Sequence, residues 1–319
     1  MQNSDHHRLN QQNKIAGGFW GLLVGDALGV PYEFHQASEI PPFEHIEMTP
    51  PENFERAHES ILPGTWSDDG AQALCLLASL LHCNRLDLAD FANRLTDWHD
   101  LGYMAVDQRV YDVGITTSHA IQKLRLGTPP HLAGPTDAHS NGNGALMRVL
   151  PLALWHQGSD KALVQDARLQ SCVTHGHLRS QLCCALYALV ARYILQNENA
   201  PWAKAVKTIR LLHHNDSEAT EELESHIRPD DPIPPEGSGY VVDSLRAANT
   251  ALQSPDYEHA VKNAIALGKD TDTTACIAGG LIGLRDGVQG IPGRWLTRLR
   301  GRELALKPLN QLLTLRSTP

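Results

Sequence analysis

The residues best suited to chemistry are two clusters rich in aspartate, about 200 residues apart in the sequence. They are Ser67-Asp68-Asp69 and Asp270-Thr271-Asp272-Thr273. Each cluster comes where a loop is predicted to pass into an apolar helix, so its oxygen atoms would gather at a helix N-terminus. Such ligands suit Mg²⁺, Mn²⁺ or Ca²⁺, and the lack of neighbouring Cys or paired His argues against zinc. The alternative is a pair of ordinary helix caps, because Ser and Asp are common there.

A third segment brings another carboxylate toward such a site. Residues 25–33 read Gly-Asp-Ala-Leu-Gly-Val-Pro-Tyr-Glu, in which Gly29 and Pro31 are predicted to end a helix. Glu33 is thereby carried into the loop beyond the helix. Taken alone, Asp26 could be a buried, hydrogen-bonded helix residue and Glu33 an exposed bystander.

A fourth segment, Ser140-Asn141-Gly142-Asn143-Gly144, precedes an apolar stretch that contains Met147 and Arg148. Glycines allow close approach to the backbone, and the free N–H groups of a helix N-terminus bind phosphate without any basic residue. The segment therefore suits a phosphate-bearing ligand. A plain turn, with Asn143 as a helix cap, is the alternative.

The elements that must position these residues are predicted to be helices. Apolar residues recur at three- to four-residue spacing over residues 71–81, 145–155, 178–196 and 273–284. The second and fourth of these stretches are apolar nearly all round, which is typical of helices in the middle of a bundle. Alternating strand patterns of useful length are hard to find. The sequence therefore predicts a compact, single-domain, all-α fold.

Three irregular stretches separate the predicted helices. Residues 35–63 and 127–144 are rich in Pro or Gly and are predicted to be loops around the site, whereas residues 215–239 are predicted to be a surface excursion. No long linker divides the 319 residues. We expect a polar N-terminal arm at residues 1–14, one domain at residues 15–300 and a C-terminal tail at residues 301–319.

Composition excludes several classes of protein. Hydrophobic residues make up 42% and charged residues 20%, as in globular chains. The net charge of −9, without a basic run, argues against nucleic acid and membrane surfaces as partners. Six cysteines without C-x-x-C spacing favour a reducing cytoplasm over disulfides. We find no secretion signal and no stretch approaching 18 apolar residues, so we expect neither export nor a membrane span.

In their order along the chain, these segments resemble the ADP-ribosylglycohydrolase family: the ADP-ribosyl-acceptor hydrolases and the related dinitrogenase reductase-activating glycohydrolase. The resemblance runs from about Ile15 to Trp295. It is carried by G-D-A-L-G-V-P-Y-E at 25–33, S-D-D at 67–69, D-V-G-I-T-T at 112–117, S-N-G-N-G-A-L-M-R at 140–148, T-H at 174–175 and D-T-D-T-T-A at 270–275. It implies an orthogonal bundle of helices around a binuclear Mg²⁺ or Mn²⁺ centre.

The resemblance also implies a role for each motif residue. The implied metal ligands are Ser67, Asp68, Asp69, Asp270, Asp272 and Thr273. The implied substrate contacts are Asp112, Gly114, Ser140, Asn141, Gly142, Asn143 and His175. Glu33 resembles a loop glutamate that contacts a metal or the attacking water and moves on substrate binding. Either Glu33 or Asp69 could be the general base, and the sequence does not choose between them.

The function expected from this resemblance is hydrolysis of the bond between ADP-ribose and a protein side chain by a metal-activated water at ribose C1″. The D-V-G and S-N-G-N-G segments resemble the dinitrogenase-reductase branch of the family more closely, and this resemblance implies arginine as the modified side chain. A different hypothesis is an immunity protein that neutralises an ADP-ribosylating toxin, using residues 1–14 to block it. A catalytically dead relative is disfavoured, because all four aspartates are present.

One position departs from the family pattern. Gly70 follows Ser-Asp-Asp where the family usually has threonine. If that threonine only supports the helix, glycine costs a few tenths to about 1 kcal/mol of stability. If its hydroxyl orients a ligand, the loss lowers metal affinity or rate by roughly 10–100-fold. We expect the supporting role, so threonine at position 70 should stabilise the protein modestly.

Overall fold

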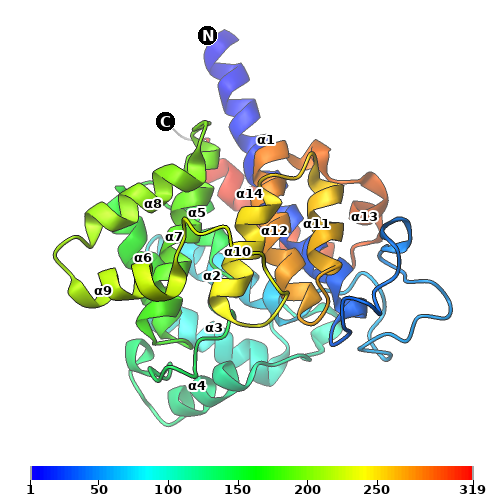
Figure 1. The fold of residues 1–319 in the computed structure, drawn as a ribbon, viewed down its shortest axis with the longest axis horizontal. Helices are drawn as coiled ribbons and strands as arrows, with labels where there is room; N and C mark the ends of the chain where they lie inside the picture. The colour runs from blue at the N-terminus through cyan, green and yellow to red at the C-terminus, as the bar shows by residue number, and fades with distance from the viewer. Residues whose placement is uncertain (1, 318–319) are drawn as a thin grey trace.

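The computed structural model describes the backbone of residues 2–317 and the side chains of residues 9–317. These residues form fourteen α-helices and no β-strand, so the all-α prediction is confirmed (Figure 1). The helices are α1 (Gln2–Gly29), α2 (Asp68–Cys83), α3 (Leu88–Leu101), α4 (Ile115–Arg125), α5 (Leu150–Trp155), α6 (Asp160–Cys172), α7 (Leu178–Leu195), α8 (Pro201–Leu212), α9 (Ser217–Glu221), α10 (Val241–Ala251), α11 (Tyr257–Ile265), α12 (Thr271–Asp286), α13 (Gly293–Arg298) and α14 (Arg302–Leu315).

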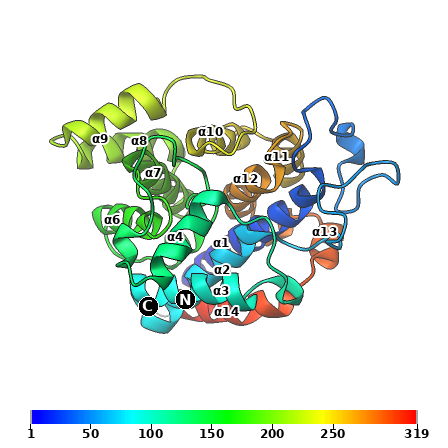
Figure 2. The same ribbon diagram turned by 90° about the horizontal axis from the view of Figure 1, so that it is seen from below.

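The centre of the fold is the close contact between α1 and α12 (Figures 1 and 2). Glycines on both helices leave no room for side chains between the two backbones. A Cβ atom on Gly21 would lie 2.4 Å from the carbonyl oxygen of Gly279, and one on Gly25 would lie 2.2 Å from that of Ala275. The contact continues to the end of α1, where the Thr271 hydroxyl donates to the carbonyl of Gly29 at 2.8 Å. The end of α1 therefore lies against the start of α12.

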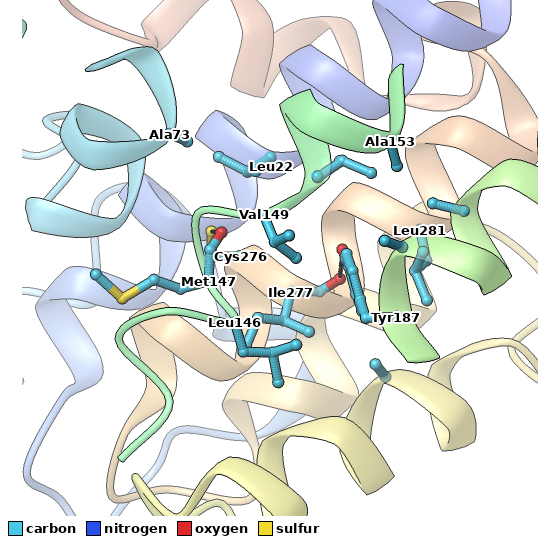
Figure 3. Packing of buried hydrophobic residues seen from close by; sticks show 14 of the residues in the cluster. Leu22, Ala73, Leu146, Met147, Val149, Ala153, Tyr187, Cys276, Ile277 and Leu281 are labelled. Atoms are coloured by element: carbon cyan, nitrogen blue, oxygen red, sulfur yellow. Dashed lines mark hydrogen bonds between the residues drawn. The ribbon is translucent and has the colours of Figure 1, made fainter. Parts of the chain in front are cut away.

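Other helices enclose this pair with apolar side chains and a few buried hydroxyls (Figure 3). Tyr187 on α7 is 1% exposed, and its hydroxyl donates to the carbonyl of Ile277 at 2.9 Å. Helix α7 is long and apolar enough to cross a membrane, and 83% of it is buried inside the protein. Helix α7 thus lies in the middle of the bundle, a place that the sequence predicted for residues 145–155 and 273–284.

Three of the four predicted helices are confirmed as α2, α7 and α12, and the fourth is wrong over half its length. Residues 145–149 form turns, and α5 begins only at Leu150. Pro151 has no N–H to donate to the carbonyl of Met147, so the helical ladder cannot extend backward there. That carbonyl instead accepts a hydrogen bond from the Cys276 thiol, whose Sγ lies 3.8 Å from the oxygen. The segment Ser140–Gly144 therefore does not open a helix.

The predicted arm, tail and surface excursion all contain helix. Residues 2–14 are the first half of α1, so the boundary predicted after residue 14 falls inside a helix (Figure 1). At that point the Lys14 amine donates to Asn197 Oδ1 at 2.7 Å. The predicted tail contains α14, which buries Leu309 and Leu312. The stretch 215–239 contains α9 and a π-helical turn over Glu222–Ile227.

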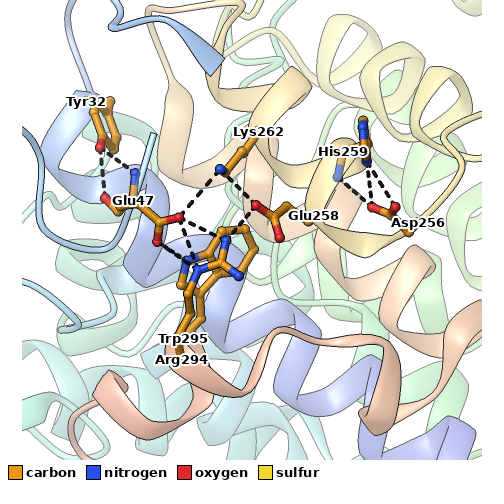
Figure 4. A network of polar contacts seen from close by, with 8 residues as sticks. All are labelled: Tyr32, Glu47, Asp256, Glu258, His259, Lys262, Arg294 and Trp295. Atoms are coloured by element: carbon orange, nitrogen blue, oxygen red, sulfur yellow. Dashed lines mark hydrogen bonds and ion pairs between the residues drawn. The ribbon is translucent and has the colours of Figure 1, made fainter. Parts of the chain in front are cut away.

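The long loop of residues 35–63 is anchored by a polar network (Figure 4). Glu47 accepts hydrogen bonds from the Trp295 indole at 2.6 Å and from Arg294 Nη2 at 2.9 Å. The buried amine of Lys262 lies 3.5 Å from Glu47 and 2.9 Å from Glu258. One carboxylate of the loop is thus tied to both α11 and α13. The loop that carries His58 is therefore held against these helices at Glu47, although most of its residues are exposed.

Because glycines form the contact between α1 and α12, the addition of a single methyl group there should have a large effect on the free energy of unfolding. We expect Gly21→Ala to lower the free energy of unfolding by about 3 kcal/mol, because the new Cβ would meet a backbone oxygen that moves only if α1 and α12 separate. Urea denaturation measures this change. Gly293→Ala is the matched control, since a Cβ there meets nothing within 4 Å. Equal stability of the two variants would contradict the account.

Candidate active site

An open cleft of about 510 Å³ lies where α1 ends and α2, α4 and α12 begin. Nine of the residues assigned a role from the sequence line it. They are Glu33, Asp68, Asp112, Gly114, Gly142, Asn143, His175, Asp270 and Thr273. Ser67, Asp69 and Asp272 are buried next to these residues but do not line the cleft. The two aspartate clusters, far apart in sequence, are therefore brought to one place.

The start of α2 is held by Asp26, which is fully buried on α1. Its Oδ1 accepts from the backbone N–H of Ser67 at 2.8 Å, and its Oδ2 accepts from that of Gly70 at 2.7 Å. Burial raises the pKa of Asp26 to about 7, although these hydrogen bonds oppose the shift. The interpretation of Asp26 as a buried, hydrogen-bonded residue is confirmed. It fixes the helix start from which Asp68 and Asp69 project.

The departure from the family pattern at Gly70 has a packing cause. A Cβ there would lie 2.8 Å from both Leu23 Cδ2 and Trp66 Cγ, and 3.0 Å from Asp26 Oδ2. The indole is fully buried and cannot withdraw. The expectation that threonine would fit and stabilise this position is therefore wrong, because the structure leaves space only for glycine.

Two of the carboxylates are fully buried and only partly hydrogen-bonded. Asp69 and Asp272 are 0% exposed. Among the described residues, Asp69 Oδ1 and both oxygens of Asp272 have no hydrogen-bond partner. Buried polar atoms are nearly always paired, and an unpaired carboxylate oxygen is costly. Three such atoms in one place indicate that something outside the protein chain completes the site.

The other carboxylates nearby are held by hydrogen bonds to the protein. Asp68 accepts from Gln72 at 2.8 Å, and Asp270 accepts from Asn143 Nδ2 at 2.7 Å. One oxygen each of Glu33, Asp270 and Asp272 lie within 4.8 Å of one another. This set of donors contains only oxygen, as a hard divalent cation prefers, and it includes the unpaired oxygens of Asp272. The residues therefore fit a metal ion.

Burial and mutual repulsion shift the titration of these groups. Burial raises the pKa values of Asp68, Asp69 and Asp272 well above their usual range, and neighbouring carboxylates add to each shift. The same causes raise the pKa of Glu33 to about 10. Without a cation, these carboxyls therefore keep their protons to a higher pH than exposed carboxyls do. A metal ion must displace those protons to bind.

Glu33 is held by a histidine that the sequence analysis missed. The Glu33 side chain is 5% exposed, and its Oε2 lies 2.7 Å from His58 Nε2. The His58 ring packs on Tyr111, with centroids 5.1 Å apart, and on Phe34 at 5.7 Å. No spacing pattern could have identified His58, because the loop has no periodicity and also contains His35 and His45, from which the sequence does not distinguish it.

A second group of residues forms the part of the cleft nearest to α4. Gly114 caps α4 without any side-chain hydrogen bond to the first turn. A Cβ on Gly144 would lie 2.8 Å from the ring of His175 and 3.3 Å from the Thr117 hydroxyl. His175 is 2% exposed, and burial lowers its pKa to about 3, so its ring is neutral. Glycines, a neutral ring and an uncapped helix start therefore meet at this wall.

Comparison with known proteins identifies the family to which this chain belongs. A family model described as ADP-ribosylglycohydrolase matches residues 7–318. The chain belongs to the ADP-ribosylglycohydrolase family. The resemblance stated from the motifs is thereby confirmed.

Relatives within the family cover nearly all of this chain. It is 30% identical over 297 residues to an ADP-ribosylarginine hydrolase of Serratia proteamaculans, covering 91% of this chain and 76% of that protein. It is 28% identical over 291 residues to the ADP-ribosyl-dinitrogen reductase glycohydrolase of Rhodospirillum rubrum, covering 90% of each. A solved structure, described as an ADP-ribosylglycohydrolase-related protein complex, superposes with a TM-score of 0.74 at 29% identity, over 96% of this chain and 98% of that one.

Two of the residues assigned to substrate in this glycohydrolase lie outside the cleft lining. The Ser140 hydroxyl donates to Asp137 Oδ2 at 2.7 Å. Asn141 is buried, and its Oδ1 accepts from the Ser180 hydroxyl at 3.0 Å. Both side chains shape the loop that presents Gly142 and Asn143. Asn143 lines the cleft and also orients Asp270, so its position serves the carboxylate cluster as well as the cleft.

The unpaired oxygens of Asp272 predict how stability depends on pH and metal. Without metal, Asp272 binds a proton in the folded state that the unfolded chain releases above pH about 4. Stability should therefore fall as pH rises, by up to about 1.4 kcal/mol per pH unit for this proton. We expect the stability gain of Asp272→Asn over the wild type to widen from about pH 5 to about pH 8.

Urea denaturation at both pH values, with and without MnCl₂, measures these effects. Mn²⁺ should stabilise the wild type and an exposed control, Asp97→Asn, but not Asp272→Asn. A variant that is still stabilised by Mn²⁺ to the wild-type extent would rule out Asp272 as a ligand.

The contact between His58 and Glu33 predicts a conservative rescue. We expect His58→Ala to lower kcat for hydrolysis of an ADP-ribosyl substrate by roughly tenfold, because Glu33 loses the group that orients it. His58→Gln should keep most of the activity, since its amide can donate to the same carboxylate. Steady-state kinetics of the two variants provide the test. If glutamine is as damaging as alanine, the ring packing rather than the hydrogen bond is what matters.

Proposed function

We propose that this protein is a metal-dependent hydrolase that removes ADP-ribose from arginine side chains of modified proteins. The observation that carries the proposal is the pair of buried aspartates, Asp69 and Asp272, beside an open cleft: among the described residues, Asp69 Oδ1 and both oxygens of Asp272 have no hydrogen-bond partner. Family membership and relatives named as ADP-ribosylarginine hydrolases support the reaction class. Relatives named as ADP-ribosylhydrolases occur among animal proteins as well.

The metal is proposed to be Mg²⁺ or Mn²⁺, with two ions in the site. Its ligands would be drawn from the two clusters and the loop glutamate. These are Ser67, Asp68, Asp69, Asp270, Asp272, Thr273 and Glu33. When bound, such ions lower the pKa of a water and hold vicinal hydroxyls of the ribose in place. Gln72 and Asn143 orient two of the carboxylates through the hydrogen bonds described above.

The diphosphate of ADP-ribose is proposed to bind at the start of α4. The backbone N–H groups of Ile115, Thr116 and Thr117 have no carbonyl partner within the helix, and no side chain of the described residues caps them. All three residues line the cleft. An uncapped helix N-terminus attracts phosphate through these N–H groups and the helix dipole. This feature replaces the helix start that was expected, wrongly, after Gly144.

Arginine is proposed as the modified side chain because of Asp112. Its carboxylate lines the cleft in a half-buried position, and among the described residues it makes no hydrogen bond or ion pair. It lies within reach of Glu33 and His58. A carboxylate can accept two parallel hydrogen bonds from a guanidinium group, whereas a serine linkage offers no positive charge.

Glu33 is proposed as the general base. It lines the cleft, whereas Asp69 is buried below it. His58 holds Oε2 of Glu33, so Oε1 would take a proton from the attacking water. The water oxygen bonds to ribose C1″ as the C1″–N bond breaks, and the bonding electrons leave with the guanidine nitrogen, which gains a proton. The products are ADP-ribose and the unmodified arginine.

Two further expectations remain proposals. The cytoplasm is proposed as the location, and the six cysteines, all of which are free thiols, support it. Neutralisation of a toxin by occlusion stays a prediction, and the segment expected to do it, residues 2–14, is the first half of α1.

The proposed function predicts a selective reaction. Incubation with arginine-, serine- and O-acetyl-linked ADP-ribose should release ADP-ribose fastest from arginine, and a chelator should abolish the reaction. We expect Asp112→Asn to raise KM for the arginine substrate by roughly tenfold, since a charge-assisted hydrogen bond is lost. Chromatographic measurement of released ADP-ribose gives each rate. Equal rates on all three linkages, or a rate unaffected by chelator, would contradict the proposal.

A further inference from the structure

Phe34 is an unusual residue at the mouth of the cleft. It follows Glu33 directly, lines the cleft and is 66% exposed. Its φ of 64° lies in the left-handed region, which aromatic residues rarely adopt. A strained backbone of this kind persists only where the surrounding structure imposes it, and such positions cluster at ligand sites. An exposed aromatic residue with a strained backbone conformation requires an explanation.

Backbone pairing imposes this conformation. The N–H of Phe34 donates to the carbonyl of Lys269 at 2.6 Å, and the N–H of Lys269 donates to that of His35, also at 2.6 Å. The neighbouring residues Gln36 and Gly268 form an antiparallel bridge. Lys269 is itself in the left-handed region, with a φ of 62°. The backbone of Phe34 is therefore held in place by pairing with the segment before α12, and its ring projects from a fixed point beside the cleft.

The position of the ring indicates what it meets. The wall proposed for ADP-ribose consists of the start of α4, Gly144 and His175, which contact one another. Phe34 lies instead with Glu33, since its ring packs on His58 and His58 is the hydrogen-bond partner of Glu33. Glu33 and Asp112 act where the arginine departs. A ring beside them lies next to the acceptor protein rather than next to the nucleotide.

We propose that Phe34 is a docking residue for the acceptor protein and that it packs on an apolar side chain adjacent to the modified arginine. The inference rests on the proposed function, because it assumes that arginine leaves past Asp112. A rigid, exposed aromatic ring is the kind of residue that dominates contacts between proteins. Since the backbone of Phe34 is held in place before binding, this segment does not have to become ordered when the acceptor docks.

The test uses two peptides that carry ADP-ribosyl-arginine, one with leucine on each side of the arginine and one with glycine on each side. We expect the wild type to bind and hydrolyse the leucine peptide roughly tenfold better than the glycine peptide. Phe34→Gly should abolish this preference. Glycine relieves the strained φ, so the variant should fold at least as well as the wild type. Leu126→Ser, at an 86% exposed site outside the cleft lining, is the matched control and should keep the preference.

Calorimetric binding is measured alongside kcat/KM, so that the two proposals can fail separately. If neither peptide is hydrolysed but the leucine peptide binds through Phe34, the proposed reaction fails and the docking residue stands. If both peptides are hydrolysed and Phe34→Gly keeps the wild-type preference, or if the wild type shows none, the docking proposal is overturned. A loss of affinity for free ADP-ribose in Phe34→Gly would also overturn it, by placing the ring on the nucleotide side.

Discussion

The backbone contact between α1 and α12 is the constraint on which the rest of the site depends. Glycines bring the two helices together without intervening side chains, so the end of α1 touches the start of α12. Asp26, on the same helix, then holds the start of α2 through two backbone hydrogen bonds. One pair of helices thus positions both aspartate clusters and Glu33. If one methyl group separated α1 from α12, both aspartate clusters and Glu33 would be displaced together.

This arrangement concentrates acidic groups where they repel one another. Asp69 and Asp272 have oxygens without a partner among the described residues, and burial raises the pKa of both carboxyls. Such a site destabilises the chain in the absence of a cation. Stability must come from elsewhere: from the apolar bundle around α7, and from networks such as the one in which Glu47 ties the long loop to α11 and α13 (Figure 4).

Much of this could be predicted from the sequence, because the determining signals are local. The apolar periodicity of α2, α7 and α12 identified those helices, and hydroxyl or carboxyl residues marked where two of them begin. The helix after Gly144 could not be placed, since the apolar pattern of residues 145–149 is the same in a turn as in a helix. His58 could not be found, because only the path of a loop brings it to Glu33. From the sequence, Gly70 was interpreted as the loss of a threonine hydroxyl. The structure explains the glycine differently, because Trp66 leaves no space for a side chain at that position.

The central claim is that the carboxylates of α2 and α12 form one site for hard cations. It is tested most directly by a crystal structure of the protein with Mn²⁺, using anomalous scattering to locate the metal. The account predicts anomalous peaks within coordination distance, about 2.0–2.3 Å, of oxygens of Asp68, Asp69, Asp270 or Asp272. Peaks confined to other parts of the surface at saturating Mn²⁺, with these carboxylates left without a metal, would contradict it.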